Sequence, residues 1–174
     1  TTDKILVFGS NGRFYTLACA NLPGGRGMGE PIRLMIDLPS EANIIALFVH
    51  KDNAKLFIAS SSGDGFIVPE REVEAQTRNG KQVLNLGSDC HAIKCCRVEG
   101  DHVAIISTSG KLLVFPIDEL PEMVRGKGVR LQKYNKSKGR QRSLELDGGL
   151  SDITTFNLSE GLSWPIGSGN FCPE

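Results

Sequence analysis

A strand-turn-strand pattern recurs along this chain at intervals of about 50 residues, and such a repeat constrains the fold more than any local motif does. The first large apolar residue after each glycine-containing turn marks the repeat, and successive markers lie 52, 46 and 59 residues apart. The markers are Phe14, Phe66, Leu112 and Phe171. A small sheet cannot bury both of its faces alone, so successive units must stack on one another. The repeat therefore predicts an all-β domain built from propeller-like blades.

The apolar runs beside the turns have the length and composition of short strands. They are rich in Ile, Val and Phe, and they cover residues 4–8, 13–17, 44–49, 55–59, 103–106 and 111–115. Turn sequences with Asn, Ser and Gly at residues 10–12, 62–65 and 108–110 predict tight hairpins. The helical candidates, residues 70–77 and 117–124, are short, and Pro121 interrupts the second.

Each predicted unit contains a hairpin, a connector, a basic glycine loop and a returning strand. The complete units cover residues 3–52, 53–100 and 101–148, and residues 149–174 form part of a fourth with a hairpin at 162–171. Returning strands are expected at residues 32–34, 83–86 and 129–131. So few blades seldom close a ring, so we expect missing blades or an open arc. Because the first residue is not Met, we also expect a fragment of a longer protein.

Charge is balanced over the whole chain but concentrated within it. The 20 basic and 20 acidic residues give no net charge, yet residues 125–142 contain eight of the cations and no acid. Like charges this close together repel one another, and a polyanion relieves that repulsion while releasing its own counterions. The segment therefore predicts contact with a nucleic acid phosphate backbone. The alternative interpretation is a solvated loop that only keeps the protein soluble.

A basic loop with glycine follows each complete hairpin. The loops contain Arg26, Arg78 and Arg125, each 12 or 13 residues beyond its hairpin marker. Glycine allows the main chain to approach a phosphate, and arginine can bind phosphate oxygens through two parallel hydrogen bonds. On an array of blades such loops would lie along one rim and bind DNA with little sequence specificity. Alternatively, they are ordinary turns that connect the blades.

Other chemistry has little support in the sequence. The five cysteines include no Cys-x-x-Cys pair, which argues against a disulfide scaffold and favours a reducing interior. No apolar run reaches the roughly 18 residues of a membrane helix, and no Gly-Lys pair has the context of a nucleotide-binding loop. Cys90, His91 and Cys95 form the least implausible zinc cluster, although buried thiols are the ordinary interpretation. An enzyme with a cysteine nucleophile lacks a recognisable Cys-His motif.

Three segments carry a family resemblance. They are Leu-Pro-Gly-Gly-Arg-Gly-Met-Gly-Glu-Pro at residues 22–31, Ala-Ser-Ser-Ser-Gly-Asp-Gly-Phe at 59–66, and Phe-Pro-Ile-Asp-Glu-Leu-Pro at 115–121 leading into Arg-Gly-Lys-Gly at 125–128. In this order and spacing they resemble the C-terminal domain of the A subunit of bacterial DNA topoisomerase IV, and the similarity covers essentially the whole chain. The resemblance implies a strand-swapped propeller called a β-pinwheel. None of the loops reproduces the Gln-Arg-Arg-Gly-Gly-Lys-Gly box of the related gyrase, so gyrase-like DNA wrapping is not implied.

The resemblance also implies a function. The family acts as an ATP-dependent type II topoisomerase that relaxes supercoils and decatenates replicated chromosomes, and a cytoplasmic, chromosome-associated location follows. Its catalytic tyrosine, metal and ATP site lie elsewhere in a heterotetramer with the B subunit, so no catalytic residue, metal site, cofactor or small-molecule substrate is expected here. The expected partner is double-stranded DNA, and the alternative is a protein-interaction platform whose basic rim binds an acidic partner. The DNA-binding positions implied are Arg26, Arg78, Lys81, Arg125, Lys127 and Arg130, with Lys133, Lys136, Lys138, Arg140 and Arg142 as an extension of the patch.

Overall fold

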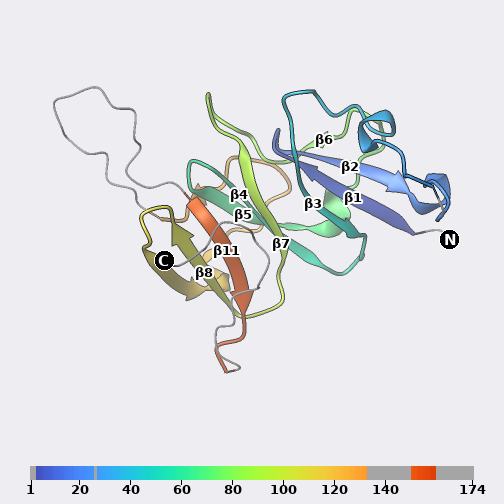
Figure 1. Ribbon diagram of the computed structural model, residues 1–174. Helices are drawn as coiled ribbons and strands as arrows, with labels where there is room; N and C mark the ends of the chain where they lie inside the picture. The colour runs from blue at the N-terminus through green and yellow to red at the C-terminus, as the bar shows by residue number, and fades with distance from the viewer. Residues whose placement is uncertain (1–2, 26, 133–149, 160–174) are drawn as a thin grey trace.

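Three antiparallel sheets stand side by side in the computed structural model, which describes residues 3–25, 27–132 and 150–159 (Figure 1). The first sheet has the order β3-β1-β2-β6, the second β10-β5-β4-β7 and the third β11-β8-β9. The predicted all-β, propeller-like architecture is confirmed. No helix within the described ranges is long and apolar enough to span a bilayer.

The strands are short, and most begin or end within a residue of the runs predicted from the sequence. The first sheet contains β1 (Lys4–Gly9), β2 (Arg13–Ala18), β3 (Ile44–Val49) and β6 (Lys81–Gln82). The second contains β4 (Lys55–Ser60), β5 (Asp64–Pro69), β7 (Ala92–Arg97) and β10 (Val129–Arg130), and the third contains β8 (His102–Ser107), β9 (Leu112–Pro116) and β11 (Leu150–Phe156). One-turn 3-10 helices lie at Cys19–Asn21, Ile32–Leu34, Glu70–Glu72 and Ile117–Glu119.

The central hairpin of each sheet has the same turn. A glycine near the end of the turn has a φ between +74° and +77°, a conformation that a residue without a Cβ adopts at little cost. Its N–H donates to the carbonyl three residues earlier at 2.9–3.0 Å. These glycines are Gly12, Gly63 and Gly110, so the three predicted hairpin turns are confirmed.

Two of the sheets receive a strand from the following unit. β6 pairs with the first two residues of β2, and β10 pairs with the first two residues of β5. The third sheet takes β11 from beyond residue 148, where the predicted third unit ends. The three sheets therefore differ from the contiguous units 3–52, 53–100 and 101–148. The path of each connector, and not sequence proximity, decides which sheet its strand joins. The predicted hairpin at 162–171 lies outside the described residues.

The expected strand at residues 32–34 is instead a 3-10 helix. Pro31 precedes it, and the Leu34 and Met35 N–H groups donate to the Pro31 and Ile32 carbonyls, both at 2.9 Å. The Arg33 guanidinium then closes the loop by donating to the Pro39 and Ala42 carbonyls at 2.6 Å. This arrangement lays the loop over the outer face of the first sheet, where its apolar side chains become buried. Those side chains include Ile36, Leu38 and Ala42.

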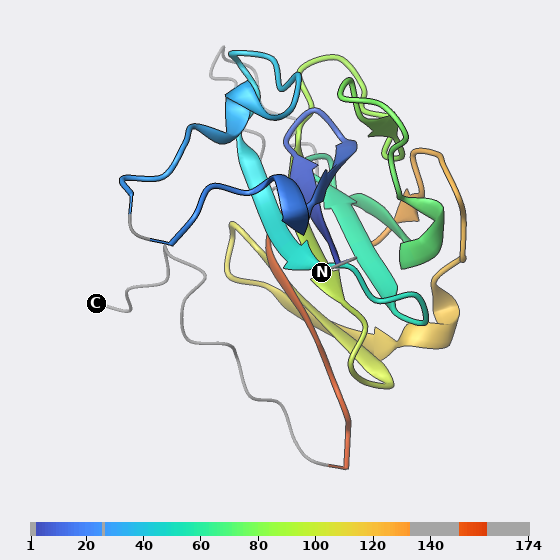
Figure 2. The ribbon, with the colours of Figure 1, turned by 90° about the vertical axis from the view of Figure 1, so that its right-hand side faces the viewer.

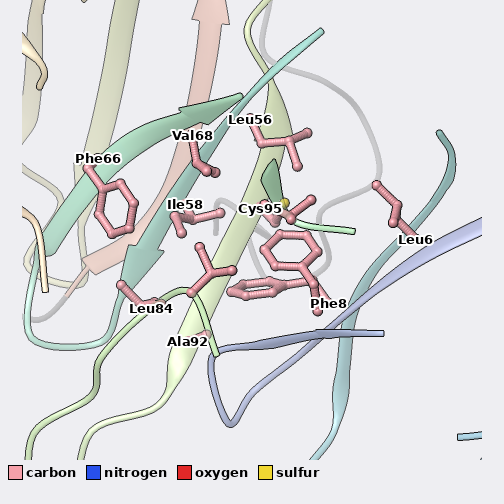
Figure 3. Packing of buried hydrophobic residues seen from close by; sticks show 12 residues of the cluster. Leu6, Phe8, Leu56, Ile58, Phe66, Val68, Leu84, Ala92 and Cys95 are labelled. Atoms are coloured by element: carbon pink, nitrogen blue, oxygen red, sulfur yellow. The ribbon is translucent and has the colours of Figure 1, made fainter. Parts of the chain in front are cut away.

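Apolar side chains fill the spaces between the sheets. Phe8 and Phe14 of the first sheet stack with ring centroids 4.5 Å apart, and they pack against Ile58 and Phe66 of the second sheet (Figure 3). A second cluster joins the second and third sheets around Phe57 and residues of β8 and β11. Burying a large apolar side chain contributes about 1.5–3 kcal/mol, so these two clusters hold the stack together.

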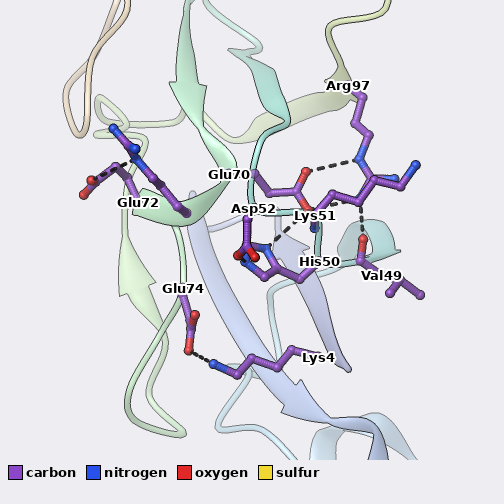
Figure 4. Close-up of polar contacts among 10 residues, drawn as sticks. Lys4, Val49, His50, Lys51, Asp52, Glu70, Glu72, Glu74 and Arg97 are labelled. Carbon is purple, nitrogen blue, oxygen red and sulfur yellow. Dashed lines mark hydrogen bonds and ion pairs between the residues drawn. The ribbon is translucent and has the colours of Figure 1, made fainter. Parts of the chain in front are cut away.

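A charged group is also buried between the first two sheets. Glu70 has no exposed surface, and its carboxylate accepts hydrogen bonds from Arg97 Nε at 3.1 Å, Arg97 Nη2 at 3.0 Å and the Lys51 N–H at 2.7 Å (Figure 4). The same guanidinium donates to the Val49 carbonyl and lies 5.0 Å from the centre of the Phe48 ring. The hydrogen bonds to Glu70 raise the pKa of Arg97 above its usual value. Through the Lys51 N–H and the Val49 carbonyl, which follow and end β3, this ion pair therefore connects the second sheet to the first.

Candidate nucleic-acid interface

Segments 78–86 and 125–131 lie next to each other at the end of the molecule that carries the hairpin turns. The Asn85 N–H donates to the Gly126 carbonyl at 2.7 Å, and the Gly126 N–H donates to the Val83 carbonyl at 3.0 Å. The same contact recurs one unit earlier, where the Asp37 N–H donates to the Arg78 carbonyl at 3.0 Å. Asn85 and Gly126 are 41 residues apart in the chain, and so are Asp37 and Arg78. The main chain thus joins successive connectors along one edge.

Two glycines of these segments allow close contacts between parts of the protein's own main chain. Gly80 and Gly128 have φ of +70° and +84°, and an added Cβ would lie 2.7 Å from the Phe14 carbonyl oxygen and 2.4 Å from that of Gly65, respectively. Each glycine therefore lets a connector approach the hairpin of the preceding sheet closely enough to form β6 or β10. The expectation that glycine brings the main chain to phosphate does not describe these two positions.

The first basic loop is placed differently. Figure 2 shows segment 78–86 in green and segment 125–132 in orange on one side of the molecule, and residues 22–25 and 27–31 in blue on the other side. Added Cβ atoms at Gly24 and Gly25 would have no neighbour within 4 Å. This loop follows the hairpin of the first sheet, and the described part of the chain contains no earlier sheet whose hairpin it could pack against.

Exposed cations lie along segments 78–86 and 125–131, and contacts within the protein hold them in place. Arg78 Nη2 donates to the Leu34 carbonyl at 2.6 Å, and Arg125 Nε donates to Asn85 Oδ1 at 3.3 Å. Lys81 differs, because it lies in β6 and its half-buried ammonium donates to the Glu72 carbonyl at 2.5 Å. The remaining predicted cations of these segments, Lys127 and Arg130, are exposed and share one acidic partner.

That partner is Asp64, whose side chain is only 5% exposed. It accepts hydrogen bonds from Ser62 Oγ at 2.7 Å and from Arg130 Nε at 2.7 Å, and Lys127 Nζ lies 3.3 Å away. Burial opposes ionisation of this carboxyl, but the hydrogen bonds from Ser62 and Arg130 and the positive charge of Arg130 outweigh it and lower the pKa of Asp64. Asp64 therefore stays ionised at neutral pH and offsets part of the positive charge of its neighbours.

The lowered pKa of Asp64 predicts an acid-sensitive contribution to stability. A carboxyl with a depressed pKa in the folded state stabilises the fold fully above its unfolded value, 3.8, and loses that contribution as the pH falls through the folded value. We expect the free energy of unfolding to fall more steeply below about pH 4 in the wild type than in the Asp64→Asn variant. Urea denaturation across that range measures it, and parallel pH profiles would contradict the expectation.

The other predicted sites fall outside the described residues. They are Arg26, Lys133, Lys136, Lys138, Arg140 and Arg142.

Two cations that the sequence analysis did not select lie at the hairpin turns. Arg13 and Lys111 each follow a turn glycine, in the position that Asp64 occupies in the second sheet. Arg13 Nη1 donates to the Asn79 carbonyl at 3.0 Å and so lies against segment 78–86. Alignment of the three turns on their glycines is the signal that finds these positions.

Two of the described cysteines, Cys95 and Cys96, do not have the properties of nucleophiles. Burial raises the pKa of the Cys95 thiol well above its usual value and that of Cys96 to about 12, which suppresses the reactive thiolate. Within residues 3–25, 27–132 and 150–159, no group of three or more His, Cys, Asp or Glu side chains is arranged to hold a metal ion.

Curated relatives cover nearly all of this chain. It is 47% identical over 164 residues to the A subunit of DNA topoisomerase 4 from Caulobacter vibrioides, covering 94% of this chain and 20% of that protein. Identity to the same protein of Rickettsia felis is 46%, covering 94% of this chain and 21% of the relative. The chain therefore spans about a fifth of the length of these relatives.

Solved structures and a family model agree with these relatives. The structure of the E. coli ParC C-terminal domain matches with a TM-score of 0.77 and 27% identity, covering 87% of this chain and 61% of that one. A crystal structure of the C-terminal domain of DNA topoisomerase IV shares the fold with a TM-score of 0.75 and 18% identity, covering 89% and 47%. The family model described as DNA gyrase C-terminal domain, beta-propeller, matches residues 3–51, 54–94 and 101–139. The chain belongs to this family, that of the C-terminal domains of the A subunits of gyrase and topoisomerase IV.

Proposed function

We propose that this chain binds duplex DNA along the edge formed by segments 78–86 and 125–131, as the C-terminal domain of the A subunit of a topoisomerase IV. One observation carries the proposal: main-chain hydrogen bonds between Asn85, Gly126 and Val83 hold the two basic segments side by side. Exposed cations on a single edge can neutralise successive phosphates of one duplex and release their counterions. The cations in question are Arg78, Arg125, Lys127 and Arg130.

The role of the domain in the whole enzyme is part of the proposal. Curated relatives that are A subunits of DNA topoisomerase 4 support an ATP-dependent type II topoisomerase that relaxes supercoils and decatenates chromosomes in the cytoplasm. In that enzyme this domain is non-catalytic. It holds a DNA segment and biases the enzyme toward particular crossings, while the B subunit together with the other parts of the A subunit supplies the chemistry with ATP and Mg²⁺. Because phosphate contacts carry no sequence information, the binding is weakly specific.

Salt dependence tests the proposal. If the eight cations of residues 125–142 neutralise about five to seven phosphates, the logarithm of the affinity should fall with the logarithm of salt concentration with a slope of about −4 to −6. Fluorescence anisotropy with a labelled duplex between low and moderate salt measures this slope for the 174-residue chain. A flat response would rule out the proposed DNA contact.

Removal of the cations of segment 125–131 assigns the contact to this edge. Replacement of Arg125, Lys127 and Arg130 by alanine should weaken duplex binding by about 1–3 kcal/mol at low salt, whatever the sequence of the duplex. The matched control replaces three cations at the opposite ends of the strands, namely the half-buried Lys4 and the exposed Lys55 and Arg71, and so removes the same charge. Equal weakening of DNA binding by both variants would show that the loss of affinity comes from the change in net charge and not from this edge. Unchanged DNA binding with loss of an acidic protein ligand would instead favour a protein-interaction platform.

A further inference from the structure

An acid occupies a position where the other two hairpins carry a cation. Asp64 directly follows the turn glycine of the second sheet, whereas Arg13 and Lys111 follow those of the first and third. A buried carboxylate is costly unless hydrogen bonds and opposite charges compensate for its lost hydration. Asp64 obtains that compensation from Arg130 and Lys127, residues of the next unit in the chain. The charges at this corner of the molecule are thus arranged around the acid.

Asp64 contacts Arg130 at the inner nitrogen of its guanidinium and Lys127 at its ammonium group. Arg130 uses Nε, which lies 2.7 Å from Asp64 Oδ1, and within the described part of the chain its two terminal Nη groups make no ion pair. The side chains of Arg130 and Lys127 remain 49% and 59% exposed. A guanidinium held through Nε still presents its terminal nitrogens to an oxyanion. Because the side chain is already ordered before DNA binds, binding costs less conformational entropy.

The main chain supports the same arrangement. Arg130 is the direct register partner of Asp64 in the β5–β10 pair, and the Leu131 N–H donates to the Gly63 carbonyl at 2.9 Å. Ser62, from the hairpin turn, donates to the other carboxylate oxygen at 2.7 Å and fixes the rotation of the carboxylate. The Asp64 carboxylate is therefore fixed in orientation, and it can in turn orient the side chains of Arg130 and Lys127.

We propose that Asp64 is a positioning residue for DNA binding, which holds Arg130 and Lys127 so that their remaining donors face the phosphate backbone. This inference rests on the proposed function. For the removal of Asp64, it predicts a change in DNA affinity opposite in sign to the change expected from net charge alone. Because an acid repels phosphate, its removal should tighten binding if charge alone mattered. If Asp64 positions the cations, its removal weakens binding although the chain becomes more positive.

The experiment compares Asp64→Asn with Asp37→Asn in the 174-residue chain. Asp37 is the matched control, because it lies 3.9 Å from Arg78 on the same edge but its side chain is 53% exposed. Both variants remove one negative charge. We expect D64N to bind a labelled duplex about five- to tenfold more weakly at low salt, with a salt slope shallower by about one to two, and D37N to bind equally well or more tightly. Equal or tighter binding by D64N overturns the inference.

A double-mutant comparison separates positioning from damage to the fold. When Arg130 and Lys127 are already alanine, D64N should cause no further loss of affinity, because the residues through which it acts are gone. A loss of full size in that background overturns the inference. Should D64N fail to fold, Ser62→Ala tests the same point without changing any charge: about twofold weaker binding supports positioning, and unchanged binding overturns it. Absence of salt-dependent binding by the wild type would instead refute the proposed function itself.

Discussion

Replacement of Arg97 by methionine is expected to lower the free energy of unfolding by about 3–5 kcal/mol, because it leaves a buried charge without its counter-ion. The Glu70 carboxylate has no exposed surface and would keep only the Lys51 N–H at 2.7 Å and the His50 ring, whose Nδ1 lies 3.4 Å away. The variant also loses the donor to the Val49 carbonyl, which connects β7 to the end of β3. Urea denaturation monitored by circular dichroism measures the change.

An exposed ion pair supplies the control for Arg97. Lys55 Nζ lies 2.5 Å from Glu122 Oε2, but the two side chains are 53% and 46% exposed. Lys55→Met should therefore lower the free energy of unfolding by no more than about 1 kcal/mol. Replacing Glu70 by glutamine in the Arg97→Met background removes the stranded charge and should recover part of the loss. Similar destabilisation by Arg97→Met and Lys55→Met would show that the buried pair does not hold the first two sheets together.

Replacement of Gly128 by alanine is expected to cost about 2–4 kcal/mol, from two effects that add. A φ of +84° costs an L-residue about 1–2 kcal/mol, and the new Cβ would lie 2.4 Å from the Gly65 carbonyl oxygen and 2.9 Å from Phe66 Cδ1. The clash can be relieved only by moving β10 away from β5. We therefore expect faster amide exchange in β10, measured by hydrogen-deuterium exchange, together with the lower free energy of unfolding.

Gly110→Ala isolates the backbone effect from the clash. Gly110 has a similar φ of +74°, but nothing lies within 4 Å of the position of an added Cβ. This variant should lose only about 1 kcal/mol, the cost of the dihedral angle alone. Equal losses of unfolding free energy for the two variants would mean that β10 can move away from β5 at no cost. The close approach at Gly128 would then not contribute to stability.

The sequence alone determined the features that depend on neighbouring residues. The run at residues 55–59 predicts β4 (Lys55–Ser60), and the Ser and Gly residues at 108–110 predict the turn before β9. Side-chain alternation and a positive φ are local properties, so a short window contains the information needed to recognise them. The interval of about 50 residues then led to stacked all-β units, because isolated small sheets cannot bury their faces.

Only the tertiary structure decided which unit completes which sheet and how the basic segments are held. β6 and β10 have two residues each, too few to show any periodicity, and their partners were selected by connectors that cross to the preceding sheet. Asp64 and Arg130 are 66 residues apart, and nothing local in the sequence indicates that one orients the other. Such contacts depend on close approach and burial, which arise only when distant parts of the chain pack together.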